Sequence, residues 1–376
     1  MTKHYQYIII GAGCAGLQLA KALLELPVEL VSSILLIDAC QQHEEKSWCF
    51  WYGTNHPYRN LVKKEWQHIE FIADGVSIEQ SILPKSYQYI NSLEFYNSHL
   101  AHFKNDDRIT IIYDKVYNIT SQKDAQPIIN TLQGNFSCEY VFYTNPLLGH
   151  STLKSPTTWQ HFLGWIIETE APVFDTDKAR MMDFSVDNTK DVQFVYVLPF
   201  KNNKALIECT IFSSIINEDA VYEATLADYI QTQLSCKYRI LVKEKGKIPM
   251  QLYQPATLQH DNIIPIGTAA GCIKPSTGYS FVRAMLHTKE IISAIQTKKQ
   301  IIQRTFKPRF VFYDRLFLHI IQYTPWIMKH IFTRLFRHNR IKTILHFLDE
   351  QTTLYQDIRI FASLPKWPFL KALLKK

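Results

Sequence analysis

The feature that most constrains the fold is a glycine-rich turn near the N-terminus. The stretch "YIIIGAGCAGLQLAKALL" predicts a strand, a turn and a helix, and Gly11, Gly13 and Gly16 have the GxGxxG spacing. A second predicted strand, "ILLID", ends at Asp38, 22 residues after Gly16. In this pattern, Gly11 makes the tight turn, Gly13 lets the backbone approach a pyrophosphate, and Gly16 lets the helix and strand pack closely. Asp38 can form a hydrogen bond with a ribose hydroxyl. With the positive end of the helix dipole, this pattern predicts a dinucleotide site in a Rossmann-type α/β domain.

A second glycine segment occurs late in the chain, in "DNIIPIGTAAGCIKPSTGYSF". It predicts a short strand running into Gly267, a turn that contains Gly271 and Gly278, and a helix starting near Tyr279. A late strand, turn and helix of this kind suits the ribityl chain and ring of FAD, which NAD-only folds do not need. We therefore expect FAD, although a purely structural glycine loop is the alternative. The candidate cofactor-binding residues of this segment are Gly267, Gly271, Pro275, Thr277 and Gly278.

Alternating polar and apolar residues dominate the middle of the chain. Such runs in 67–80 and 162–213 predict antiparallel strands, whereas helices are predicted at 92–104 and 217–234. We expect an α/β protein whose FAD-binding domain comprises 1–63, about 92–150 and 255–298. The antiparallel-sheet substrate domain, inserted into it, comprises about 64–91 and 151–254, and a helical C-terminal region comprises 299–376.

The C-terminal region carries the basic character of the protein. Residues 301–376 contain 14 Lys and Arg against 4 Asp and Glu, whereas residues 1–300 have a net charge of −3. This basic, aromatic and helix-patterned region has no run of 18 uncharged residues, which is typical of helices that lie on an anionic membrane surface. A helical subdomain with an aromatic core fits the pattern equally well. No nucleic-acid-binding motif accompanies the charge, so nucleic acid is not an expected partner.

The seven cysteines form no CxxC or Cys/His pattern, so neither a disulfide framework nor a metal site is expected. The N-terminal residues lack the pattern of a secretory signal peptide. Both observations favour a cytoplasmic protein. Together with the membrane-surface interpretation of the tail, they lead us to expect a protein bound peripherally to the inner face of the cell membrane.

The strand "KALIECT" carries the carboxyl group of most interest. Period-two alternation places Leu206, Glu208 and Thr210 on one face, but does not say which face is buried. Glu208 is either a structural acid or a proton donor. Asp183, in "MMDF" on a neighbouring predicted strand, is the second candidate, and a pairing with Arg180 is its structural alternative.

Several stretches together resemble the flavoprotein lycopene cyclases of bacteria and plants, over almost the whole chain. They are "KSWCFW", "FLGWIIETEAPVFD", "YVLPF" followed by "LIECT", "GKIPM", "PIGTAAGCIKPSTGYSF", and "FYDRLF" and "FLDEQT" in the tail. The resemblance implies a fold like that of FAD-dependent hydroxylases and geranylgeranyl reductases, and membrane association. It also implies cyclisation of linear carotenoids, lycopene above all, to γ-carotene and β-carotene without net redox change, with reduced FAD and with NADPH as its electron donor. Glu208 matches the essential acid of the family, whereas Cys209 stands where relatives commonly have a second acid.

Such a cyclisation protonates an alkene, and the cation that forms must be kept from water. A carboxyl group suits this step when burial raises its pKa, and aromatic faces stabilise the cation. Trp48, Phe50, Trp51 and Trp165 are candidates for these faces, with a plain core role as the alternative. FAD-dependent hydroxylases and prenyl-chain reductases acting on a membrane lipid share the expected fold and form the alternative function. A membrane-surface binding protein is a third possibility, which leaves Glu208 unexplained.

Overall fold

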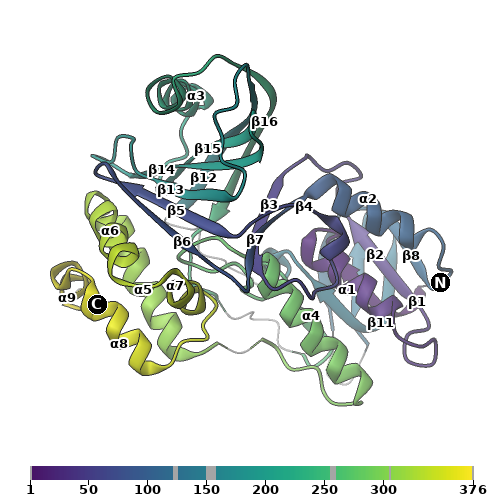
Figure 1. The fold of residues 1–376 in the computed structure, drawn as a ribbon. Helices are drawn as coiled ribbons and strands as arrows, with labels where there is room; N and C mark the ends of the chain where they lie inside the picture. Colours follow the sequence, from purple (N-terminus) through teal and green to yellow (C-terminus); the bar gives the residue numbers. More distant parts are fainter. Residues whose placement is uncertain (1, 122–125, 150–157, 255–259, 305, 375–376) are drawn as a thin grey trace.

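Three β-sheets and a C-terminal group of helices make up the part of the chain that the computed structural model describes, residues 2–121, 126–149, 158–254, 260–304 and 306–374 (Figure 1). The domain boundaries expected near 150 and 255 fall at or beside residues outside these ranges. The position of each sheet explains how the site is assembled.

The first sheet has the parallel order expected of a nucleotide-binding domain. Its parallel strands are β8 (Ile109–Tyr113), β2 (Ile34–Asp38), β1 (Lys3–Ile10), β11 (Asn135–Tyr143) and β17 (Ile263–Pro265). Antiparallel strands β10 (Ile128–Thr131) and β9 (Val116–Thr120) extend it beyond β11. β17 returns from the late glycine segment to pair with β11, as the sequence predicted.

Three helices belong to this domain. They are α1 (Cys14–Leu24), α2 (Ser92–Phe103) and α4 (Phe281–Gln296). The side chain of Asn91 caps α2 by accepting a hydrogen bond from the backbone N–H of Glu94. α4 begins two residues after the predicted start at Tyr279 and packs against α1. The apolar β1 and β2 lie inside the domain because helices and loops cover both faces.

The second sheet is long and almost entirely antiparallel. Its order is β16 (Tyr238–Pro249), β12 (Trp159–Thr169), β15 (Lys204–Ser213), β14 (Val192–Lys201), β13 (Lys178–Asp183), β5 (His68–Ala73) and β6 (Val76–Ser81). Only the pairing of β13 with β5 is parallel among the described strand pairs of this sheet. Two of its strands, β5 and β6, come from the part of the chain before α2. That part of the chain leaves the first sheet, contributes these strands to the second sheet and then returns to α2.

A third, three-stranded sheet lies between the other two in Figure 1. It consists of β3 (Ser47–Tyr52), β7 (Ser86–Asn91) and β4 (Val62–Trp66), all antiparallel. We expected 47–63 and 86–91 to be divided between the two domains, but here they pair with each other. This small sheet therefore joins the nucleotide-binding domain to the long sheet.

Different elements pack on the two faces of the long sheet. α3 (Asp219–Tyr229), which continues as a π-helical turn over Ile230–Leu234, packs on one face, within the helical segment predicted at 217–234. The small sheet and the C-terminal helices pack on the other face. These helices are α5 (Pro308–Tyr323), α6 (Met328–His338), α7 (Ile341–Leu348), α8 (Leu354–Ser363) and α9 (Lys366–Leu374).

Sequence signals explain where the C-terminal helices begin. Pro308 is at the first position of α5, where the missing N–H costs nothing, and Thr353 and Gln356 form a capping box at the start of α8. The ring of Phe336 in α6 stacks on Phe71 in β5, with centroids 4.4 Å apart. Much of the aromatic character of the tail is therefore core, which was one of the two interpretations of its pattern.

Candidate active site

A cavity of about 390 Å³ lies where the long sheet, the small sheet and the turn before α4 meet. Residues of all three contribute to its wall, together with Cys14 from the first glycine turn. The residues most relevant to its chemistry are Lys46, Trp48, Cys49, Tyr87, Gln160, Phe162, Tyr196, Leu206, Glu208, Lys247, Thr277, Tyr279 and Phe281. The cavity thus brings the candidate carboxyl group and the late glycine turn together.

Glu208 of β15 faces this cavity. The predicted alternation holds, because Leu206 and Glu208 line the cavity while Ile207 and Cys209 pack under α3. Glu208 is partly exposed and lines the cavity, while the surrounding protein buries much of its carboxyl group. Thr210 Oγ1 donates a hydrogen bond to Glu208 Oε1 over 3.0 Å. Burial, and secondly the charge of Glu244, raise the pKa of Glu208 to about 8, so the carboxyl group keeps its proton at neutral pH.

Several of the groups near Glu208 are aromatic or thiol side chains that carry no charge. Tyr87 and Tyr279 share a hydrogen bond of 3.2 Å between their hydroxyl oxygens. Burial raises the pKa of Tyr279 to about 12 and raises the pKa values of Tyr87, Tyr196 and the Cys49 thiol well above their ordinary values. All four therefore stay protonated and neutral. Such a wall suits a cationic intermediate, because neutral rings attract a cation and do not capture it.

The four aromatic residues predicted for this wall have three different positions. Trp48 lines the cavity. Phe50 and Trp51 are buried behind it, where Phe50 stacks on Phe281 with centroids 4.4 Å apart and Trp51 meets Tyr279 edge-on at 4.5 Å. Trp165 is on the opposite face of the long sheet, among the residues packed under α3. Trp165 therefore has the plain core role.

Asp183 also lies on the face covered by α3. Its carboxylate accepts hydrogen bonds from the hydroxyl of Tyr229 (2.6 Å), from Arg180 Nη1 (3.1 Å) and from the N–H of Ser185 (2.9 Å). The side chain is fully buried in this network. The structure does not bring Asp183 and Glu208 together, and the pairing with Arg180 is the contact observed.

A carboxyl group that sequence reasoning missed is near Glu208 instead. Glu244 of β16 is only 7% exposed and accepts a hydrogen bond of 2.8 Å from the N–H of Ser47. Burial is the main cause that raises its pKa. The sequence offered one weak signal, since Glu244 comes just before the "GKIPM" segment. The order of β16, β12 and β15 in the sheet, which brings it near Glu208, is not visible in a local pattern.

The first glycine turn has the geometry that its spacing predicted. Gly11 has a φ of +102°, and a Cβ there would be 1.9 Å from Thr144 Oγ1. A Cβ at Gly16 would be 1.9 Å from the carbonyl oxygen of Gly11, whereas Gly13, at the uncapped start of α1, has open space around it. Asp38 accepts hydrogen bonds from the N–H groups of Ala12 (2.5 Å) and Cys40 (2.8 Å). Its carboxylate has further lone pairs for a ribose hydroxyl.

The late glycine turn contributes to the cavity through Thr277 and Gly278. Gly278 has a φ of +77°, and a Cβ there would be 2.5 Å from Gln160 Oε1. Thr277 Oγ1 and Gln160 Oε1 are buried and have no hydrogen-bond partner among the described residues. Pro275 is buried and does not line the cavity. A Cβ at Gly267 would be 2.8 Å from Cβ of Ala15, so the two glycine turns lie against each other.

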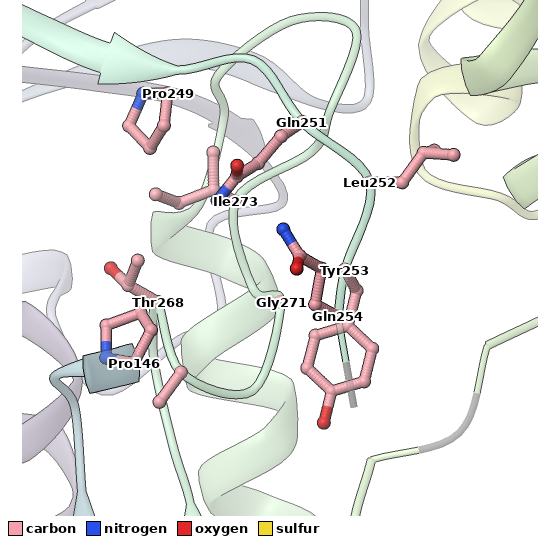
Figure 2. Close-up of a pocket in the computed structure, with 10 residues that line it drawn as sticks. Pro146, Pro249, Gln251, Leu252, Tyr253, Gln254, Thr268, Gly271 and Ile273 are labelled. Carbon is pink, nitrogen blue, oxygen red and sulfur yellow. The ribbon is translucent and has the colours of Figure 1, made fainter. Parts of the chain in front are cut away.

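Gly271 lines a different and much smaller cavity. Figure 2 shows Gly271 there with Thr268, Ile273 and Tyr253. Its volume is about 40 Å³, whereas one water molecule occupies about 30 Å³ in the liquid. This space is too small for a cofactor or a carotenoid, so the larger cavity is the candidate active site.

A model of a known protein family decides the relationship of the chain. The model, described as lycopene cyclase protein, matches residues 6–374. The chain belongs to the lycopene cyclase family. In this lycopene cyclase family member, the match includes both glycine turns, Glu208 and the C-terminal helices.

Individual relatives are more distant. This lycopene cyclase family member is 32% identical over 128 residues to the lycopene beta-cyclase of Paracoccus sp. (strain N81106 / MBIC 01143), a match that covers 32% of each chain. The aligned part thus spans about a third of that relative.

The fold of this chain is similar to that of a geranylgeranyl bacteriochlorophyll reductase-like protein from Thermoplasma acidophilum, with a TM-score of 0.59 and 14% identity over 100% of this chain and 97% of that chain. It is also similar to the flavin-dependent brominase Bmp2, with a TM-score of 0.54 and 12% identity over 99% of both chains. These structures confirm the predicted fold class.

The described residues of this lycopene cyclase family member fit FAD. The open Gly13 and the uncapped N-terminus of α1 leave room and N–H donors for a pyrophosphate. Thr277 and Gln160, whose side-chain oxygens have no hydrogen-bond partner among the described residues, line the cavity beside the late glycine turn, where a ribityl chain and ring would lie.

Proposed function

We propose that the protein is a lycopene β-cyclase that converts the linear ψ-ends of lycopene to β-ionone rings, giving γ-carotene and β-carotene. The observation that carries the proposal is a largely buried carboxyl group with a raised pKa, Glu208, in a cavity with aromatic side chains beside the flavin-type turn. Family membership supports the same reaction class.

In the proposed reaction Glu208 protonates the terminal alkene. The neighbouring double bond attacks the resulting tertiary cation, and loss of a proton forms the ring alkene, so the substrate has no net change in redox state. Trp48, Phe162 and Phe281 exclude water and face the cation. Tyr196 and Tyr279 remain neutral near Glu208 and do not compete as anions for the cation.

The proposed cofactor is reduced FAD, with NADPH as the electron donor. Gly11, Gly13, Gly16 and Asp38 would hold its pyrophosphate and ribose, while Thr277 and Gly278 would lie along its ribityl chain. When bound, reduced FAD would supply electron density that stabilises cationic character in the cavity.

We also propose peripheral attachment to the cytoplasmic face of the membrane through the C-terminal helices. Among the described residues, no helix is both long and apolar enough to cross a membrane. α8 and α9 lie at the outer edge of the molecule in Figure 1 and expose large apolar side chains, namely Leu354, Tyr355, Ile358, Trp367 and Leu370.

The acidic residues of this region support the same surface. All four form ion pairs with basic residues within the protein, in the pairs Asp314 with Lys274, Asp349 with Lys85, Glu350 with Arg283, and Asp357 with Arg309. Their negative charges are thus paired within the protein, and most of the other basic side chains of the described part of the tail are exposed and would be available to anionic lipid headgroups.

The test is expression in cells that accumulate lycopene, followed by product analysis. We expect β-carotene with the mass of lycopene from the native chain, and conversion lowered about 100-fold or more by Glu208→Gln. Glu223→Gln, which removes an exposed carboxylate beyond the other face of the sheet, is the matched control and should convert normally. A product of altered mass would identify a hydroxylase or reductase instead. Normal conversion of lycopene by the Glu208→Gln variant would refute the assignment of Glu208 as the proton donor.

A further inference from the structure

Glu208 belongs to a row of residues that crosses four strands on one face of the long sheet. Tyr196 of β14 is opposite Glu208, Glu208 is opposite Gly164 of β12, and Gly164 is opposite Glu244 of β16. Directly opposed residues in antiparallel strands share a face. Since neighbouring strands are about 4.8 Å apart, the two glutamates are two strand spacings apart with only a glycine between them.

The absence of a side chain at Gly164 lets side chains of β15 lie close over β12, between the two glutamates. A Cβ on Gly164 would be 2.9 Å from Leu206 Cδ1, 3.3 Å from Glu208 Cβ and 3.4 Å from Glu208 Cγ. The first part of the Glu208 side chain therefore packs directly against Gly164. Any larger residue at position 164 would separate Glu208 from Glu244.

One carboxyl oxygen of Glu244 forms no hydrogen bond with the described residues. Oε2 accepts the hydrogen bond from the N–H of Ser47, whereas the buried Oε1 has no partner among the described residues. An unsatisfied buried polar atom costs about 1–3 kcal/mol. A neighbouring carboxyl group that holds a proton can satisfy such an oxygen, as in the paired carboxyl groups of other proteins.

We propose that Glu244 is a positioning residue that acts through Glu208, and that the two carboxyl groups hold one proton between them across Gly164. The negative charge left on Glu244 keeps the proton on Glu208 in the resting enzyme. The proposal rests on the proposed cyclisation for its catalytic use, but the proton sharing is a property of the protein alone.

The pair explains how one residue both gives and takes the proton. Glu208 transfers its proton to the alkene carbon and becomes a carboxylate facing the carboxylate of Glu244. The ring cation then loses a proton from the adjacent carbon to Glu208, which restores the starting state with nothing oxidised or reduced. Repulsion between the two carboxylates favours this return over loss of the proton to any other base.

Few other groups influence the titration of the pair. Around Glu208 they are Tyr196, Tyr279 and Cys49, which burial keeps neutral. Around Glu244 the charged groups are Lys46, which lowers its pKa, and Glu45, which raises it. Further charged and titratable groups near the pair are Lys247 at the cavity wall and Tyr89 of β7, whose pKa burial raises to about 12.

The experiment is an infrared titration of the purified holoenzyme from pH 5 to pH 10, following the carbonyl band of protonated carboxyl groups. The band of Glu208 is identified as the one lost in Glu208→Gln. In Glu244→Gln, which keeps the shape and the acceptor for Ser47, we expect its midpoint to fall by about one pH unit or more. The alkaline limit of cyclisation should fall equally, because the donor form is lost as pH rises through the pKa of Glu208.

Glu223→Gln is the matched control and should leave the midpoint unchanged. Glu244→Asp, which keeps the charge, should return the midpoint most of the way to the native value. An unchanged midpoint in Glu244→Gln, as a merely structural role requires, overturns the proposal. In the native protein itself, the two carboxyl groups should lose their protons in two separate steps, and a single-site titration overturns the proposal even where a variant does not fold. If Glu244→Gln shifts the midpoint as expected but the native protein leaves lycopene unchanged, the proposed function is refuted while the proton sharing between Glu208 and Glu244 stands.

Discussion

Replacing Glu208 by Gln should stabilise the protein while abolishing its proposed reaction. Burial and the charge of Glu244 raise the pKa of Glu208 from its ordinary value of 4.5 to about 8. The folded state therefore binds a proton more tightly than the unfolded state between these two values, and stability falls as pH rises through this window. The free energy of unfolding falls by about 1.4 kcal/mol per pH unit in this window. Glu208→Gln removes this pH-dependent loss because the amide does not titrate.

The magnitude follows from the width of the window. The gain from Glu208→Gln should be below about 1 kcal/mol at pH 5, about 3 kcal/mol at pH 7 and about 5 kcal/mol above pH 8. The amide can still accept the hydrogen bond from Thr210, so no new unsatisfied group arises. Urea unfolding of both proteins at pH 5, 6, 7 and 8 measures the difference. A difference that is the same at every pH, or that matches Glu223→Gln, would refute the assignment of a raised pKa to Glu208.

Three further predictions address the turn, the opposite sheet face and the tail. Gly278→Ala forces a residue with a side chain into a backbone conformation of φ +77°, which costs about 1–2 kcal/mol, and should lower the flavin absorbance per mole of purified protein. Asp183→Asn should lower the free energy of unfolding by about 2–3 kcal/mol, because it weakens a buried ion pair, and should leave lycopene conversion per folded molecule unchanged; a loss of conversion without a loss of stability would contradict this. The double variant Trp367→Ala/Leu370→Ala should reduce sedimentation with anionic phospholipid vesicles at least about tenfold, since each side chain contributes about 1.5–3 kcal/mol when buried in lipid. Equal binding by this variant and by Ile215→Ala, an exposed apolar residue elsewhere, would refute the proposed membrane surface.

The features that the sequence predicted are those with a local physical cause. The glycine spacing determines a turn whose contacts are made within a few residues, and the alternation around Glu208 determines which residues share a face. The prediction of a short returning strand before Gly267 was confirmed, because a short apolar run before a glycine turn typically forms a buried strand.

The features that the sequence did not predict depend on strand order. Asp183 and Glu208 both belong to alternating strands, but the offset between β13 and its neighbours places their carboxyl groups on opposite faces. Glu244 is 36 residues from Glu208 and meets it only because β12 inserts between their strands and presents a glycine there. Neither relation has a signature in composition, periodicity or spacing.

The tail connects the proposed membrane surface to the proposed site. Lys274, at the start of the late glycine turn, is 3% exposed and pairs with Asp314 of α5 over 2.7 Å, and Ser276 of the same turn donates to the other oxygen of Asp314. Asp349, after α7, accepts a hydrogen bond of 2.9 Å from Trp51 behind the cavity wall. Removing one partner of such a buried charge pair costs about 3–5 kcal/mol, so these contacts hold the turn and the tail as one unit. If the tail binds lipid through α8 and α9 as proposed, these contacts would hold the late glycine turn, and the cavity wall that it forms, in a fixed position relative to the bilayer.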